Sequence, residues 1–160
     1  MKKIMLGVLF FISCLFANEI KFDMNFTKDT SCEIRKRKLY QNPIWASKIE
    51  FKNGKNAFFC SPKSMFEFYF NEEKWKTFEI QSLSDFTNIL ITDYKTSKIV
   101  DAKKAFFVYG SSKISPAGDD LVAFESKEDA SNYLQNNNGK RIFSFDEVKN
   151  SLVRLLNGRI

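Results

Sequence analysis

A twofold internal repeat is the feature that most constrains how this chain can fold. Residues 57–68 can be laid over residues 122–133 at an offset of 65 positions, and each segment holds an apolar run that ends in phenylalanine. A serine suited to cap a helix follows two positions later, Ser61 in the first segment and Ser126 in the second. Proline comes directly after Ser61, where a missing N–H is harmless, and an acid comes three residues after Ser126. The repeat therefore predicts two copies of one strand-to-helix unit.

Further strand-like runs flank both copies of the repeat. Two runs in the first half face each other across Asn53-Gly54, a strong hairpin signal, and two in the second half are joined by a loop with Pro116 and Gly118. The runs predicted as strands are 46–51, 57–59 and 89–92 in the first half, and 105–109, 121–124 and 141–145 in the second. Each half is thus expected to form a ββαβ unit.

The last apolar pattern of the chain has helical spacing. It comprises Val148, Leu152, Leu155 and Leu156 and stops at Asn157-Gly158. We predict an α+β fold with two similar ββαβ units plus a C-terminal helix. The expected divisions are a signal peptide (1–17), an N-terminal segment (18–44), a first unit (45–100) and a second unit with the final helix (101–160), with 71–88 and 93–104 as polar surface connections.

The start of the chain predicts export. Two lysines precede an apolar run over residues 4–12, which is too short for a membrane span and typical of a secretory signal. Cleavage after Ala17 would release a soluble protein, whereas the lipobox-like sequence ending at Cys14 would give a lipid-anchored one. We expect a periplasmic protein in either case, and the two processing sites remain alternatives.

Composition removes several function classes. The 160 residues include no histidine, which excludes Ser-His-Asp and Cys-His nucleophile systems, HExxH zinc sites and CxxCH haem attachment. Loss of Lys2 and Lys3 with the leader lowers the net charge from +6 to +4, a modest value for a nucleic-acid binder. We therefore expect neither nucleic-acid binding nor imidazole chemistry.

The acidic residues do not predict catalysis. Glu72-Glu73 follows a helix and Asp119-Asp120 follows a turn, positions where acids are ordinarily solvated, so a hydrolase is not expected. Asp93 and Asp101 stand at strand ends, where short acids accept hydrogen bonds from the backbone of turns. We expect both to be structural.

Two thiols remain in the exported chain, Cys32 and Cys60. A disulfide between them would close a loop of about 28 residues and stabilise the fold by about 3 kcal/mol. Alternatively, the two sulfurs are ligands of a soft metal. The pattern of residues leaves both alternatives open, with two unpaired thiols as a third.

An ordered series of short motifs resembles the NosL family, the accessory proteins of nitrous oxide reductase. The series covers about residues 45–150 and consists of Phe59-Cys60-Ser61 with Met65, Asp93-Tyr94-Lys95-Thr96, residues 100–111, Ser115-Pro116-Ala117-Gly118, Ala123-Phe124, Asp129-Ala130 and residues 138–148. The resemblance implies an exported protein, often a lipoprotein, with two similar ββαβ halves. It also implies Cu(I) binding without enzymatic turnover, and delivery of the copper to the reductase with the help of a membrane transporter complex.

The chain departs from the family pattern at two places. Family members typically carry Cys-x-x-Cys-Gly-Met before the first hairpin, whereas this chain keeps Cys32 and has Arg35 in place of the second cysteine. The methionine of the family's Pro-Met-Gly turn is replaced by Ala117. Both changes remove a soft ligand that the family offers.

The remaining soft atoms define the predicted copper site. Cu(I) accepts thiolate and thioether ligands and needs no imidazole; the candidates are Cys32, Cys60, Met65 and Met24. We expect Cys32 to be the first ligand, reduced and reachable, because the basic run 35–38 beside it favours a thiolate. Met65 and Cys60 could instead be buried core residues. The basic run has two interpretations of its own: a solvated loop, or a docking patch for an acidic partner or a membrane surface.

Overall fold

The computed structural model describes residues 23–159. The predicted leader and the Cys14 lipidation site lie outside the described residues. The first half contains β1 (Ser47–Phe51), β2 (Asn56–Phe59), α1 (Pro62–Tyr69), α2 (Glu72–Trp75), β3 (Phe86–Thr92) and β4 (Ile99–Asp101). The second half contains β5 (Phe106–Ser115), β6 (Gly118–Phe124), α3 (Lys127–Asn136), β7 (Arg141–Ser144) and α4 (Asn150–Leu156).

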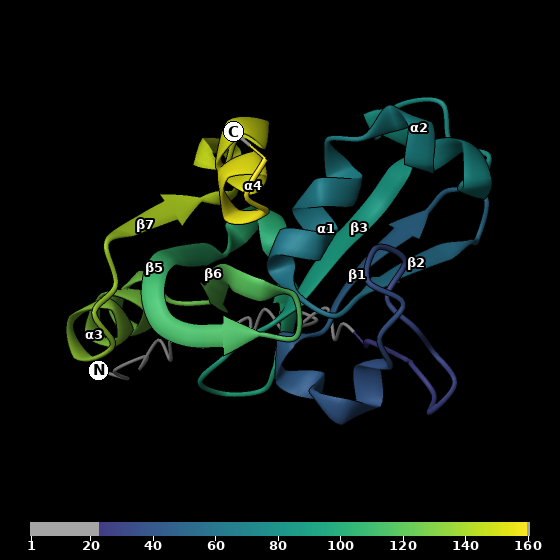
Figure 1. The fold of residues 1–160 in the computed structure, drawn as a ribbon. Helices are drawn as coiled ribbons and strands as arrows, with labels where there is room; N and C mark the ends of the chain where they lie inside the picture. The colour runs from purple at the N-terminus through teal and green to yellow at the C-terminus, as the bar shows by residue number, and fades with distance from the viewer. Residues whose placement is uncertain (1–22, 160) are drawn as a thin grey trace, which may run out of the picture.

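Two antiparallel sheets repeat one topology (Figure 1). The first sheet has the order β2-β1-β3-β4 and the second β6-β5-β7, so the first strand of each unit lies between the second and the third. The α+β fold with two ββαβ units and a final helix is therefore confirmed. β4 is an addition to the first unit that has no counterpart in the second sheet.

The segments 71–88 and 93–104 are more ordered than polar connections, which corrects the prediction. They contain α2, several 3-10 turns, the beginning of β3 and all of β4. Trp75 anchors the first segment because its side chain is buried and its indole N–H donates to the carbonyl of Phe68 at 2.8 Å. A single buried aromatic residue fixes this stretch without any long periodic pattern.

Helix α1 joins the two halves through the main hydrophobic core. Phe66 is fully buried on α1, and its ring lies 5.2 Å from that of Phe107 on β5 and 5.0 Å from that of Phe145. The same core continues to the first sheet, where Phe59 packs 5.3 Å from Phe68. A smaller cluster under α3 includes Val108 and holds the other face of the second sheet. The residues at the start of α1 therefore lie where the two halves meet.

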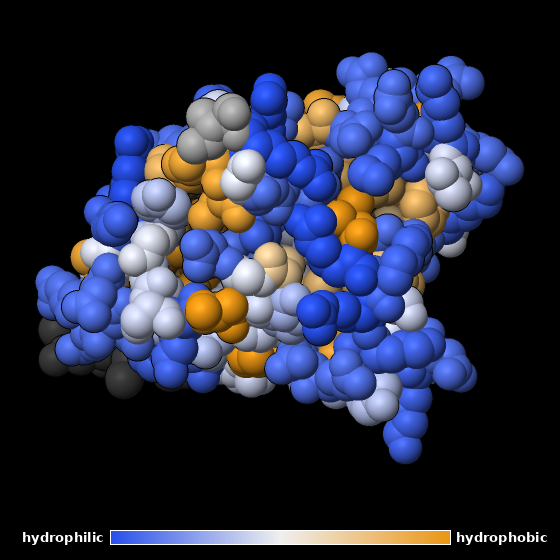
Figure 2. Space-filling view, viewed as in Figure 1, coloured by the Kyte–Doolittle hydropathy of each residue, from blue (hydrophilic) through white to orange (hydrophobic). Residues whose placement is uncertain are grey.

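The surface is mostly polar on the face shown in Figure 2, with apolar residues in small separate groups. Among residues 23–159, no helix has the length and apolar character needed to cross a membrane.

Candidate metal centre

Cys60 lies at the junction where β2 ends and α1 begins. The predicted cap is confirmed, because the Ser61 side chain accepts a hydrogen bond from the backbone N–H of Ser64 at 3.1 Å and Pro62 takes the first helical position. The packed junction leaves Cys60 only 2% exposed. The sequence therefore fixes the backbone around this sulfur locally.

Cys32 lies in a tight loop of the N-terminal segment. Its backbone N–H donates to the carbonyl of Arg37 at 2.8 Å, and its carbonyl accepts from the N–H of Lys36 at 2.8 Å. Lys36 has a φ of 55°, a left-handed conformation that glycine adopts most readily. The N–H of Glu33 donates to the carbonyl of Phe58 at 2.9 Å, which attaches the loop to the edge of β2. This attachment brings Cys32 to the end of the strand that carries Cys60.

The side chains of Cys32 and Cys60 lie close enough to shift each other's pKa. They are not joined by a disulfide in this structure. The hydrogen bond from the Cys60 side chain lowers the pKa of Cys32 to about 6; burial opposes this, and the backbone N–H groups of Cys60, Arg35 and Ile34 assist it. The same hydrogen bond, together with burial, raises the pKa of Cys60. At neutral pH the pair therefore consists of a Cys32 thiolate and a Cys60 thiol.

The cause of the thiolate differs from the prediction. We expected the positive charge of the basic run to favour it, whereas hydrogen bonds lower the Cys32 pKa. The backbone N–H of Arg35 donates to Cys32 Sγ at 3.4 Å, while the Arg35 side chain points to other partners. The run contributes through its backbone geometry rather than its charge.

The exposure of the site also corrects the prediction. Cys32 was expected to be reachable, but its exposed fraction is 0%. The turn Cys32–Arg35 folds back on the sulfur through the Arg35 N–H and is attached to β2 at the carbonyl of Phe58. The thiol pair is therefore sealed from solvent in this structure.

The methionine candidates lie in the same hydrophobic core as the thiols. Met65 is 0% exposed on α1 and Met24 is 4% exposed in the N-terminal segment. Within residues 23–159, no group of three or more His, Cys, Asp or Glu side chains gathers at a point where it could hold a metal. Cys32 and Cys60 lie close enough to shift each other's pKa, and ligation by the methionines stays a prediction. Two sulfur donors suit a soft monovalent ion.

The basic run contains an anchored Arg35, two exposed residues and Lys38, which is half-buried and donates to the carbonyl of Asp29 at 2.7 Å. The Arg35 Nη2 donates to Glu67 Oε2 at 2.6 Å and to Asn157 Oδ1 at 2.7 Å. Lys36 and Arg37 are exposed. The solvated-loop interpretation therefore fails for Arg35, because a carboxylate on α1 and an amide at the end of α4 anchor its side chain.

Asp120 is a structural residue of the site that the sequence did not reveal. We expected it to be solvated, but it is 4% exposed and accepts hydrogen bonds from the Lys63 N–H at 2.7 Å, the Leu121 N–H at 2.8 Å and the Ser115 hydroxyl at 2.6 Å. Burial raises its pKa, and these hydrogen bonds oppose the rise. Asp120 thus ties the start of α1 to the β5–β6 hairpin.

The predicted roles of the other two acids are confirmed. Asp93 Oδ1 accepts from the backbone N–H groups of Lys95 and Thr96, and Asp101 accepts from the N–H of Lys103. Neither contributes to the thiol pair.

Comparison with known proteins identifies the family. The family model described as NosL matches residues 23–153. The chain belongs to the NosL family. A crystal structure of the copper chaperone NosL from Shewanella denitrificans has the same fold, with a TM-score of 0.66 at 20% sequence identity, over 82% of this chain and 98% of that one. A search of curated proteins found no match. The family match includes the Cys32 loop, which lies outside the stretch on which the sequence resemblance rested.

Proposed function

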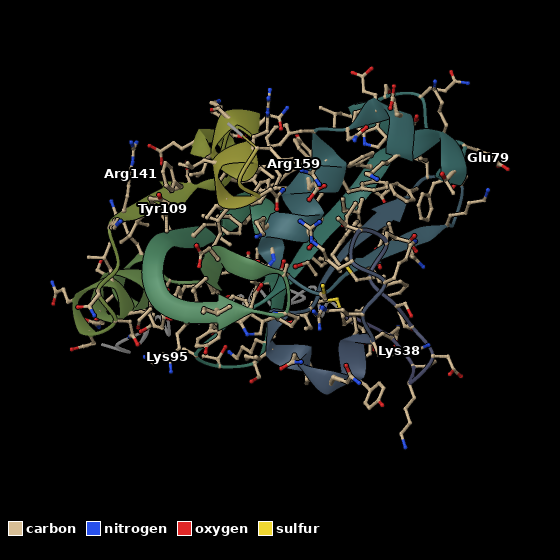
Figure 3. All side chains as sticks on the ribbon, in the orientation of Figure 1. Lys38, Glu79, Lys95, Tyr109, Arg141 and Arg159 are labelled. Atoms are coloured by element: carbon tan, nitrogen blue, oxygen red, sulfur yellow. The ribbon has the colours of Figure 1, made fainter. Side chains whose placement is uncertain are left out.

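We propose that this NosL-family protein binds Cu(I) through Cys32 and Cys60 and carries it to a copper enzyme during maturation. The observation that supports this most is the thiol pair. The side chains of two cysteines 28 positions apart shift each other's pKa, that of Cys32 to about 6, on the fold of a copper chaperone. In Figure 3, sulfur atoms lie near the centre of the view.

The chemistry of the pair suits the capture of a soft ion. The Cys32 thiolate is a ready ligand, and Cu(I) displaces the proton of Cys60 to give a bis-thiolate complex. One proton leaves for each copper bound at neutral pH, and no change of oxidation state is needed. A dry, apolar surrounding protects the bound ion from water and from oxidation.

The family suggests the recipient and the location. We infer that the protein works in the periplasm, free or lipid-anchored through Cys14, with nitrous oxide reductase or a related copper enzyme as recipient. A membrane transporter complex is the second expected partner. The positively charged start and short apolar run of the chain support export.

A competition titration with a Cu(I) chelator tests the proposal. The wild-type protein should bind one Cu(I) per chain under reducing conditions. Cys32→Ala should lower the affinity more than about tenfold, because outer-shell partners alone are worth ~10–100-fold. Glu125→Ala, at the equivalent position of the second half, is the matched control and should bind as the wild type does. Unchanged affinity in Cys32→Ala would remove this residue from the site.

A metal-free interaction module is the alternative function. The contact between the two thiols favours it as well, because oxidation could join them in a disulfide. Thiol counting on protein purified from the periplasm separates the two functions. A fully oxidised pair that also fails to take up Cu(I) after reduction would exclude the copper carrier.

A further inference from the structure

The sealed thiol pair raises the question of how copper enters and leaves. Transfer between proteins exchanges one sulfur ligand for another at the ion, so a partner's sulfur must reach the site. Cys32 and Cys60 are 0% and 2% exposed. One of the elements around them must therefore move, and the turn Cys32–Arg35 is the smallest of these.

This turn is fastened at two points. On one side, the Glu33 N–H donates to the carbonyl of Phe58 on β2. On the other side, the Arg35 guanidinium bonds Glu67 Oε2 at 2.6 Å and Asn157 Oδ1 at 2.7 Å. The Asn157 amide also donates to Glu67 Oε2 at 2.9 Å, which closes a triangle of three side chains from three distant segments. The second fastening depends on how the end of α4 is placed.

Glu67 is well placed to hold this triangle. Its side chain is 11% exposed, against 22% for Arg35, so solvent screens the ion pair less than an ordinary surface pair. Arg159 adds a longer contact to the other carboxylate oxygen at 3.3 Å. Figure 3 labels Arg159 beside α4, on the side of the molecule away from Lys38. The Glu67 carboxylate on α1 therefore contacts both the Cys32 turn and the residues that follow α4.

The end of α4 is held by these polar contacts and by Leu152 and Leu156, which are half-buried against the main core. The helix has seven residues, and only Val153 among them is buried. Leu155 is 42% exposed, and the Leu156 carbonyl accepts a hydrogen bond from Lys63 Nζ at 3.2 Å. A short helix with one buried residue belongs to the parts of a fold that open locally at low free energy.

We propose that Arg35, Glu67 and Asn157 form a latch that closes the Cys32 turn over the thiol pair, and that release of the α4 end opens it. In this account the three are positioning residues, and the open turn presents Cys32 to the sulfur of a copper donor or acceptor. The role in copper transfer rests on the proposed function, whereas the closure of the turn can be tested on the thiols alone.

The latch is tested by alkylation of the native, reduced protein with N-ethylmaleimide, with peptide mapping to follow Cys32 separately. Asn157→Ala should accelerate the reaction about tenfold, because hydrogen bonds to charged groups are among the stronger ones. Arg35→Ala should accelerate it further. The alkylation rate of Arg35→Lys should lie between those of the wild type and Arg35→Ala, because an ammonium group can pair with Glu67 but cannot span both acceptors.

Asn137→Ala is the matched control. Asn137 also follows the last residue of a helix, α3, and its amide donates to the carbonyl of Tyr133 at 3.0 Å, away from the thiols. This variant should react at the wild-type rate. Equal rates in Asn157→Ala, Arg35→Ala and the control would overturn the latch.

Two further measurements separate opening from other causes. The increase in alkylation rate should be independent of urea at low concentration, because a local opening exposes little surface. A rate that rises with urea at every concentration would mean that the thiols react through global unfolding, and this result would also overturn the latch. On copper-loaded protein, Asn157→Ala should pass Cu(I) to a chelator faster than Asn137→Ala does. A wild-type protein that binds no Cu(I) would refute the proposed function, while the alkylation rates would still decide the latch.

Discussion

The junctions where β2 meets α1 and β6 meets α3 are built alike but differ in chemistry. Each has a buried phenylalanine and a serine cap: the Ser61 hydroxyl accepts from the Ser64 N–H at 3.1 Å, and the Ser126 hydroxyl accepts from the Asp129 N–H at 3.2 Å. The residue between them is Cys60 at the first junction and Glu125 at the second. Cys60 is buried, whereas Glu125 is exposed.

The surroundings explain this difference. The Cys32 loop and the second half of the molecule contact the first junction, whereas Glu125 at the second junction is exposed. A buried aspartate from the opposite half is bound to each: Asp120 accepts from the Lys63 N–H, and Asp93 Oδ2 accepts from the Glu125 N–H at 2.6 Å. Duplication of the unit therefore gave two equivalent frameworks, and only the one covered by an additional segment can hold a dry sulfur site.

Moving the thiol from one junction to the other should have the largest effect. In the double variant Cys60→Ser, Glu125→Cys, the Cu(I) affinity should fall at least ~100-fold, because a ligand contributes more than its outer-shell partners. The new thiol has no sulfur partner and is exposed. A chelator titration measures the loss. Retention of wild-type affinity would show that the first junction is not special.

Cu(I) affinity should depend on pH with two slopes. Above the Cys32 pKa of about 6, copper displaces the Cys60 proton alone; below it, copper displaces both protons. The logarithm of affinity should therefore fall about one unit per pH unit down to pH 6 and about two units below it. Competition titrations between pH 5 and 8, roughly the range of retained stability, measure this. A single slope across that range would contradict a thiolate–thiol pair.

The buried carboxyl at the first junction should make stability pH-dependent. The pKa of Asp120 is raised above the ordinary value of 3.8, so the folded state binds more protons than the unfolded state between the two values. The unfolding free energy contributed by this group therefore falls as pH rises through that window. Asp120→Asn should remove the fall in denaturant titrations, and Asp119→Asn, an exposed neighbour, should keep it. Parallel pH profiles for wild type and Asp120→Asn would refute the assignment.

An exposed ion pair in the second half should matter least. Lys95 Nζ lies 2.5 Å from Asp129 Oδ1, but the lysine side chain is 61% exposed. Lys95→Ala should change the melting temperature by no more than about 2 °C, since solvent screens such pairs. Arg35→Ala leaves Glu67 without its main partner and should therefore lower the melting temperature more than Lys95→Ala does. Calorimetry of the two variants measures the difference. A larger loss in Lys95→Ala than in Arg35→Ala would contradict the expectation that the more buried ion pair contributes more.

The local sequence predicted much of the fold and little of the site. Ser61 and Ser126 marked both helix starts because capping depends on near neighbours. The hairpin at Asn53-Gly54 was predictable for the same reason. α2 was missed because it has four residues and no periodic pattern, and its position follows from the burial of Trp75.

The site could not be assembled from sequence because its parts meet through long-range contacts. The attachment of Cys32 to β2 uses a backbone hydrogen bond to Phe58, which no side-chain pattern reveals. The partners of Arg35 are 32 and 122 positions away. The sequence places Asp120 after a turn, where acids are ordinarily solvated, and its main donor, the Lys63 N–H, belongs to the other half.

X-ray absorption spectroscopy of the copper-loaded protein shows whether Cys32 and Cys60 hold the ion. The account predicts a Cu(I) edge and a first shell made of two sulfur donors, one of which is lost in Cys32→Ala. A first shell dominated by oxygen or nitrogen, or one that keeps both sulfurs when Cys32 is replaced, would contradict it.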